Sequence, residues 1–133
     1  PSAGWLSIIG SSIAGFLPGP LMATYYATKS YVVSLTLGVY GELKKSKSNI
    51  YVGCLCPGPV DTEFNKVAQV DFSLKGLTSE FVAQYAIKKM FKKKTIIIPG
   101  MTMKLSYIGS KFLPKKFLLG VAYKLQKKKI GGN

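Results

Sequence analysis

The feature that most constrains the fold is a series of three short apolar runs, each ended by glycine or proline. The runs occupy residues 5–9, 50–56 and 95–98, and they stop at Gly10, at Pro57-Gly58-Pro59 and at Pro99-Gly100. Short apolar runs bounded by such breakers are typical of buried β-strands.

Helical stretches separate the three runs. Residues 23–45 have a helical pattern with lysines at the C-terminal end. Its small and apolar stripes are Ala27, Tyr31, Ser34 and Gly38, and Tyr31, Leu35, Val39 and Leu43. Residues 80–92 follow Thr78 or Ser79, and either hydroxyl can cap a helix. The order strand, helix, strand, helix, strand predicts an α/β fold in which a parallel sheet is connected by right-handed crossovers.

After Gly100 the chain alternates apolar and basic residues through two expected helices, which Pro114 separates. The two apolar stripes are Met101, Leu105, Ile108 and Phe112 in the first helix, and Leu118, Val121, Ala122 and Leu125 in the second. We therefore divide the chain into an α/β unit at residues 1–100 and a basic amphipathic helical extension at residues 101–133.

With 133 residues, the chain has room for one domain or part of one. Its first residue is Pro1, so we expect the sequence to begin mid-protein. Cys54 and Cys56 point to the same face of one strand, which indicates core thiols. With no histidine and few other ligands, we expect no metal site, and reduced thiols fit a cytoplasmic protein.

The net charge of +14 comes entirely from lysine, because the chain contains no arginine. Specific nucleic-acid recognition depends on the planar guanidinium group, so we exclude a nucleic-acid partner. Thirteen of the nineteen basic residues follow Glu80, and no acidic residue does. We expect the extension either to contact an anionic membrane surface peripherally or to pack its apolar stripes on the protein while its lysines face solvent.

Three side chains predict a proton-transfer site. Tyr25 and Lys29 are four residues apart, so in a helix they share one face, and the ammonium stabilises the phenolate form of the tyrosine. A phenol in this setting can exchange a proton near neutral pH. Ser12, thirteen residues before Tyr25, can donate a hydrogen bond to a reacting oxygen. Tyr26 is the weaker candidate, because Ser30 stands four residues after it.

With Ser12, Tyr25, Lys29 and the later run Pro57-Gly58-Pro59-Val60-Asp61-Thr62, the chain resembles the short-chain dehydrogenase/reductase family. The resemblance covers residues 5–99 and corresponds to the C-terminal half of that family's Rossmann-like, doubly wound parallel sheet. It implies that Tyr25 is the acid/base and that Lys29 supports it and binds the nicotinamide ribose. Ser12, preferred to Ser11, would hydrogen-bond the substrate oxygen.

The resemblance also implies a cofactor, NAD or NADP, and a carbonyl or alcohol as substrate. The residues expected to bind the cofactor are Tyr25, Lys29, Pro57, Gly58, Val60 and Thr62, although Pro57 and Gly58 also fit a simple strand-ending turn. The residues expected to bind substrate are Ser12, Phe16, Leu17 and Met22. The apolar side chains of the last three favour a hydrophobic substrate and equally fit a core. A short helix is expected from about residue 63, capped by Asp61 or Thr62.

The family's Gly-rich phosphate turn, its ribose-selecting residue and its Asn-Ala-Gly segment have no counterpart in this sequence. We therefore expect an NAD(P)-dependent oxidoreductase whose isolated 133-residue part is inactive. The alternative is a non-catalytic basic module that binds a membrane surface or a partner. The resemblance further implies a homo-oligomer in which helix 23–45 packs on its symmetry mate through small residues such as Ser34 and Gly38, which also fit packing on the sheet.

Overall fold

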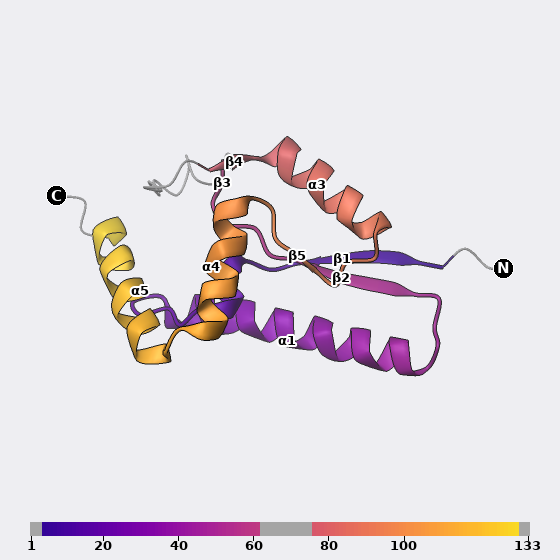
Figure 1. The fold of residues 1–133 in the computed structure, drawn as a ribbon, viewed down its shortest axis with the longest axis horizontal. Coiled ribbons are helices and arrows are strands. Elements are labelled where there is room, and N and C mark those ends of the chain that lie inside the picture. Colours follow the sequence, from indigo (N-terminus) through magenta and orange to yellow (C-terminus); the bar gives the residue numbers. More distant parts are fainter. Residues whose placement is uncertain (1–3, 62–75, 131–133) are drawn as a thin grey trace.

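The computed structural model describes residues 4–61 and 76–130. Its centre is a three-stranded parallel sheet with the order β1-β2-β5, formed by β1 (Leu6–Gly10), β2 (Tyr51–Leu55) and β5 (Ile96–Ile97). The register pairs Leu6 with Tyr51 and Cys54 with Ile96. The predicted parallel α/β arrangement is confirmed (Figure 1).

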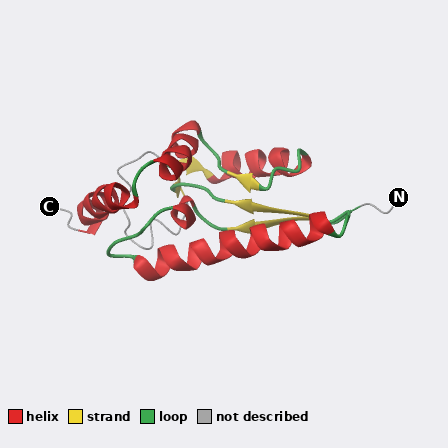
Figure 2. Ribbon diagram, turned by 60° about the horizontal axis from the view of Figure 1, so that its bottom comes forward, coloured by secondary structure: helices red, strands yellow, loops and turns green. Residues whose placement is uncertain are grey.

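Helices connect and flank these strands (Figure 2). The elements between and beyond the strands are a 3-10 helix, η1 (Ile13–Phe16), followed by α1 (Ala23–Lys45), α3 (Ser79–Phe91), α4 (Met101–Phe112) and α5 (Lys115–Ile130). Thr78 caps α3, because its hydroxyl oxygen accepts a hydrogen bond from the N–H of Phe81 at 3.2 Å. The sequence offered Thr78 and Ser79 as candidates for this cap. The break between α4 and α5 at Pro114 also follows the prediction.

A second, smaller sheet was not predicted from the sequence. It pairs β3 (Val60–Asp61) in parallel with β4 (Leu77–Thr78). Each strand has only two residues, too few to show an alternation of apolar and polar side chains. The helix expected from residue 63, with Thr62 as one of its two proposed caps, lies outside the described residues.

The core lies between α1, the strands and α4. Val33, Cys54, Cys56 and Ile98 form its buried centre, so the two cysteines are core residues as expected. Their sulfur atoms lie 3.6 Å apart. Hydrogen bonding to Cys54, together with burial, raises the pKa of the Cys56 thiol.

The packed faces of two helices differ from the stripes that the sequence suggests. In α1 the buried side chains are Val33 and Thr36, whereas Tyr31 and Leu35 of the predicted stripe are exposed. In α4 the side chains that reach the core are Met103 and Tyr107, whereas the predicted stripe is exposed: Met101, Leu105, Ile108 and Phe112.

Among residues 4–61 and 76–130, no helix has the length and apolar character needed to cross a bilayer.

Two glycines give a test of this packing. A Cβ at Gly15 would lie 2.8 Å from Cγ2 of Val33 and 2.9 Å from the carbonyl oxygen of Lys29, whereas a Cβ at Gly38 in α1 would have no heavy atom within 4 Å. We predict that Gly15→Ala lowers the free energy of unfolding by about 1–3 kcal/mol. Gly38→Ala should raise it by about 0.5–1 kcal/mol, because alanine favours the helix. Urea unfolding measures both, and a change of the same sign in the two variants would contradict the described packing.

Candidate active site

The site begins where β1 and β2 end, because hydrogen bonds continue between the loops that follow them. The N–H of Ser11 donates to the carbonyl of Leu55 at 2.7 Å, and the N–H of Ile13 donates to the carbonyl of Pro57 at 3.0 Å. The loop of Ser11 and Ser12, here called the serine loop, therefore runs beside the Pro57-Gly58-Pro59 loop at the carboxyl edge of the sheet. Ligands of open α/β sheets bind at this edge.

The two serines of this loop have different roles in the structure. Ser11 is buried, and its hydroxyl donates to the carbonyl of Lys29 at 2.9 Å, which ties the loop to α1. Ser12 is half-buried and caps η1, with its hydroxyl oxygen accepting from the N–H of Ala14 at 3.2 Å. The same hydroxyl lies 3.5 Å from the carbonyl oxygen of Pro57, a long hydrogen bond that a ligand oxygen can replace.

Tyr25 and Lys29 lie in the first turns of α1, as the sequence predicts. The ammonium nitrogen of Lys29 is 5.5 Å from the centre of the Tyr25 ring. The Tyr25 side chain is 43% exposed, and Lys29 is half-buried. Within the part of the chain that the structure describes, neither the Tyr25 hydroxyl nor the Lys29 ammonium bonds to another protein group. Both polar groups are therefore available to a ligand.

Hydrogen bonds to the backbone fix this part of α1. The Thr28 hydroxyl donates to the carbonyl of Tyr25 at 2.7 Å, and the Ser30 hydroxyl donates to the carbonyl of Gly15 at 2.8 Å. Together with the bond from Ser11 to Lys29, these contacts hold the serine loop against the turn that carries the tyrosine and the lysine.

The expected cofactor residues after β2 lie beside the serine loop, with one exception. Pro57 accepts the hydrogen bonds from Ile13 and Ser12, and Val60 begins β3. At Gly58 an added Cβ would meet the side chain of Met103, so the missing side chain makes room for α4. Thr62 lies outside the described residues.

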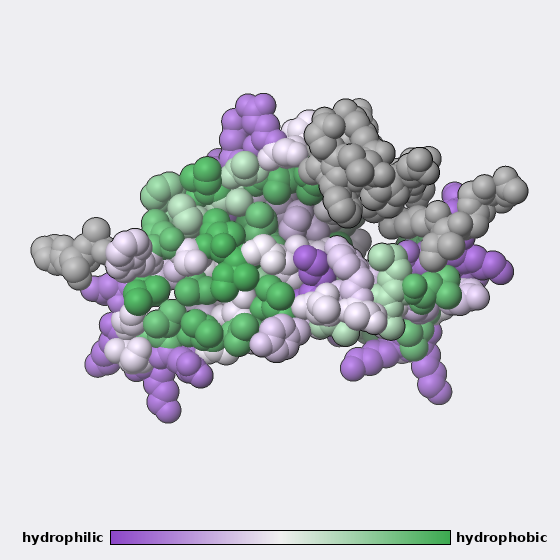
Figure 3. Space-filling model, turned by 180° about the vertical axis from the view of Figure 1, so that it is seen from behind, coloured by the Kyte–Doolittle hydropathy of each residue, from purple (hydrophilic) through white to green (hydrophobic). Residues whose placement is uncertain are grey.

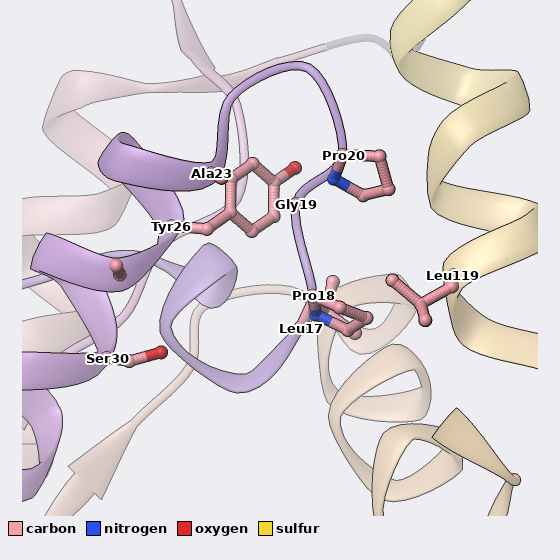
Figure 4. A pocket seen from close by; sticks show the side chains of 9 residues that line it. Leu17, Pro18, Gly19, Pro20, Ala23, Tyr26, Ser30 and Leu119 are labelled. Atoms are coloured by element: carbon pink, nitrogen blue, oxygen red, sulfur yellow. The ribbon is translucent and has the colours of Figure 1, made fainter. Parts of the chain in front are cut away.

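The expected substrate residues separate into different environments. Phe16 packs edge-on against Tyr107 of α4, with the ring centres 4.7 Å apart, and belongs to the rim of the core. Met22 precedes α1 and is exposed. Leu17 lines an open pocket of about 470 Å³. The other lining residues, shown in Figure 4, are Pro18, Gly19, Pro20, Ala23, Tyr26, Ala27, Ser30 and Leu119.

Helix α5 supplies a wall of this pocket that was not predicted from the sequence. Leu119 faces the loop of residues 17–20 across the pocket (Figure 4). Deeper along α5, the side-chain amide of Gln126 donates to the Tyr26 hydroxyl at 2.7 Å. Gln126 is only 4% exposed, and its amide oxygen has no hydrogen-bond partner among the described residues. The sequence does hold one signal for this contact. Gln126 is a polar residue that continues the helical spacing of the apolar stripe, four positions after Ala122 and eight after Leu118.

Comparison with known sequences gives one family. The family model described as short chain dehydrogenase matches residues 7–71. Dehydrogenase/reductase SDR family member 4 from Bos taurus is 34% identical over 89 residues, which are 67% of this chain and 28% of that protein. Dehydrogenase/reductase SDR family member 11 from Homo sapiens is 33% identical over 88 residues, which are 58% of this chain and 34% of that protein. The chain thus spans about a third or less of these relatives.

Solved structures resemble the fold. A short-chain dehydrogenase from Sphingobium yanoikuyae in complex with NADPH aligns with a TM-score of 0.64 and 25% identity, over 80% of this chain and 42% of that one. A 7beta-hydroxysteroid dehydrogenase aligns with a TM-score of 0.72 and 21% identity, over 87% of this chain and 45% of that one. The second alignment supports the fold alone.

The contact between α1 and α5 gives a prediction. Tyr26→Phe leaves the buried amide of Gln126 without its partner, so we expect a loss of about 1–3 kcal/mol in the free energy of unfolding. Gln126→Leu should cost less, because it also removes the amide oxygen that is already unpaired. Urea unfolding of the single and double variants measures the coupling. Tyr31→Phe, on the exposed side of α1, serves as the control and should change little.

Proposed function

The chain belongs to the short-chain dehydrogenase/reductase family over the residues that its family model and relatives match, and from this we propose that it carries the proton-transfer site of an NAD(P)-dependent oxidoreductase. The reaction interconverts a carbonyl and an alcohol. Tyr25, Lys29 and Ser12 are the catalytic residues.

The observation that carries the proposal is the arrangement of Tyr25 and Lys29. The Lys29 ammonium lies 5.5 Å from the centre of the partly exposed Tyr25 ring, so a phenol that can give or take a proton and a positive charge lie together on one face of α1. Both groups lack other protein hydrogen-bond partners among the described residues, and the ammonium has three donors. This donor set fits the hydroxyl groups of a nicotinamide ribose and a substrate oxygen.

The roles of the three side chains follow from their chemistry. The bound nicotinamide supplies or accepts the hydride. During reduction the Tyr25 hydroxyl gives its proton to the substrate oxygen, and during oxidation the phenolate takes the alcohol proton. Lys29 supplies a positive charge beside the phenol, and its ammonium would donate hydrogen bonds to the ribose hydroxyls. Ser12 turns its hydroxyl from Pro57 to the substrate oxygen and stabilises the charge that develops there.

We further propose that the cofactor is NAD or NADP and that Pro57, Gly58, Val60 and Thr62 border its nicotinamide end. The S. yanoikuyae structure was solved with NADPH, and a related structure from Burkholderia phymatum was solved with NAD. The hydroxyl of Ser12 lies 3.5 Å from the carbonyl oxygen of Pro57, and this contact supports the proposal that the loop borders the nicotinamide.

The open edge of the sheet supports a larger cofactor site than these residues form. β1 is an outer strand of the described sheet, and Trp5, Leu6 and Ile9 along it are exposed, Trp5 by 79%. An apolar edge strand is a ready partner for another strand. Because the curated relatives are about three to four times as long as the matched segments, we propose that further strands pair with β1 and carry the remaining cofactor contacts.

The substrate that we propose is an apolar carbonyl or alcohol. The pocket beside α1 would hold its apolar part, whereas Ser12, Tyr25 and Lys29, none of which lines that pocket, would meet its oxygen. Apart from the polar groups of Tyr26 and Ser30, the side chains lining the pocket beside α1 are apolar, and Leu119 closes one side. Leu17 is the predicted substrate residue that lines it. Such a lining gains free energy by removing apolar surface from water.

We also propose a homo-oligomer in which α1 packs on its symmetry mate. Ser34 and Gly38 are exposed, and nothing lies within 4 Å of a Cβ at Gly38, so these small residues are not used against the sheet. Their neighbour Leu35 adds exposed apolar surface to the same helix.

The alternative function is a basic module that binds a partner or a membrane without catalysis. It predicts that Tyr25 and Lys29 can be replaced without loss of function. The free hydroxyl and ammonium at the edge of the sheet favour the enzyme, since packing alone gives them no role.

Tyr25→Phe tests the acid/base assignment, because it removes the ionisable hydroxyl and keeps the ring. In the natural polypeptide that carries this sequence, we expect kcat/KM for carbonyl reduction to fall by about 100-fold or more. Tyr31→Phe, which lies on the same helix and is exposed, is the matched control and should retain normal turnover. Retention of most of the turnover by Tyr25→Phe would refute the assignment.

Lys29→Met tests the two proposed roles of the lysine, beside the phenol and at the cofactor ribose. We expect kcat to fall and KM for the nicotinamide cofactor to rise together, because the ammonium serves both the phenolate and the ribose. Lys44→Met, at the other end of α1, removes the same charge away from the site and should leave both constants unchanged. A change in kcat alone would exclude the ribose contact.

A further inference from the structure

The turn between α4 and α5 exposes large apolar side chains. We call residues 111–117 the α4–α5 corner. Phe112 is 81% exposed, the highest value among the large apolar side chains of the described residues, and Phe117 and Leu113 are 56% and 43% exposed. Large apolar side chains exposed this close together in the sequence are unfavourable in water and indicate a contact with another apolar phase.

Lysines surround these side chains. Lys111, Lys115 and Lys116 belong to the same corner, and no acidic residue follows Glu80 in the sequence. The Lys111 ammonium lies 4.4 Å from the centre of the Tyr107 ring. None of the three forms an ion pair within residues 4–61 and 76–130. The corner therefore combines exposed aromatic rings with uncompensated positive charge.

The side of the molecule that carries the corner is separate from the open edge of the sheet. α4 and α5 lie at the end of the molecule away from the N-terminus (Figure 1), where Gln126 of α5 bonds to Tyr26 in the first turn of α1. Seen from behind, the end of the molecule formed by these helices shows apolar side chains with hydrophilic side chains projecting around them (Figure 3). Further strands that pair with β1 would lie along that strand, which runs toward the other end of the molecule.

The chemistry of the corner selects one kind of partner. A second copy in a symmetric contact would bring lysine against lysine, which is repulsive. A nucleic acid offers no apolar phase for Phe112 and Phe117. An anionic bilayer offers both an interfacial region for aromatic rings and negative headgroups for lysines.

We propose that the α4–α5 corner docks the protein peripherally on an anionic phospholipid bilayer. Phe112, Leu113 and Phe117 enter the interfacial region, and Lys111, Lys115 and Lys116 contact the headgroup phosphates. The anchoring contacts of the two helices stay in place, because Met103, Tyr107 and Gln126 face the protein.

Vesicle co-sedimentation tests the proposal. We expect the protein to bind phosphatidylcholine vesicles that contain phosphatidylserine, to bind pure phosphatidylcholine weakly, and to be released by salt. The combined variant Lys111→Gln, Lys115→Gln and Lys116→Gln should bind about 100-fold more weakly, at roughly fivefold per lysine. Truncation after Gly100 is a poorer test, because α4 packs on the core.

Matched variants at the other end of the molecule control for total charge and for exposed phenylalanine. Lys44→Gln, Lys45→Gln and Lys47→Gln together remove the same charge at the far end of α1 (Figure 1) and should bind within a few-fold of wild type. Phe112→Ser with Phe117→Ser should lose binding, whereas Phe91→Ser, at a position that is 69% exposed in α3, should retain it.

The outcome separates docking from catalysis. Tyr25→Phe should bind vesicles as wild type does, since docking uses no catalytic group. Equal losses in the corner variants and the control variants would overturn the proposal, as would undiminished binding by the corner variants. If Phe112→Ser with Phe117→Ser instead abolishes a dimer or the capture of an acidic protein, and the wild type ignores anionic vesicles, the partner is a protein and the proposal is wrong.

Discussion

The parallel pairing of β1 with β2 is the constraint on which the rest of the structure depends. Its register continues beyond the strands, through the bonds from Ser11 to Leu55 and from Ile13 to Pro57. The loops that follow the two strands therefore lie in contact, although Ser12 and Pro57 are 45 residues apart in the sequence. A shift of register by one residue would break the bonds from Ser11 to Leu55 and from Ile13 to Pro57 and would separate these loops.

Helix α1 is positioned by serine hydroxyls rather than by apolar packing alone. Ser11 and Ser30 donate to the carbonyls of Lys29 and Gly15, and Gly15 has no side chain to hold the loop away. Such bonds fix the backbone of the helix and use none of the polar atoms of Tyr25 or the ammonium of Lys29. The same arrangement thus gives rigidity and leaves the reactive groups available, as a preorganised site requires.

The elements and the Tyr25–Lys29 contact could be predicted from the sequence, because both depend on local spacing. Residues 23–45 form the helix that the pattern indicates, and four residues in a helix bring the lysine to the ring. The bond between Tyr26 and Gln126 joins residues that are 100 positions apart, and no local pattern encodes such a pairing. The orientation of α4 was also beyond prediction, since Met103 and Tyr107 face inward to meet Phe16 and the core.

The two C-terminal helices bury the polar side chain of Gln126 and leave Phe112 and Phe117 exposed, the reverse of what burial of apolar surface favours, although Tyr107 packs inward. Gln126 is buried because Tyr26 offers it a hydrogen bond, and this contact orients α5 with Leu118 and Ala122 on the same inner face. Once that face is fixed, Phe117 must point away from the protein. Packing within the described chain therefore sets the direction of the corner but does not explain its aromatic residues, and the lysines beside them indicate an apolar phase with a negatively charged surface.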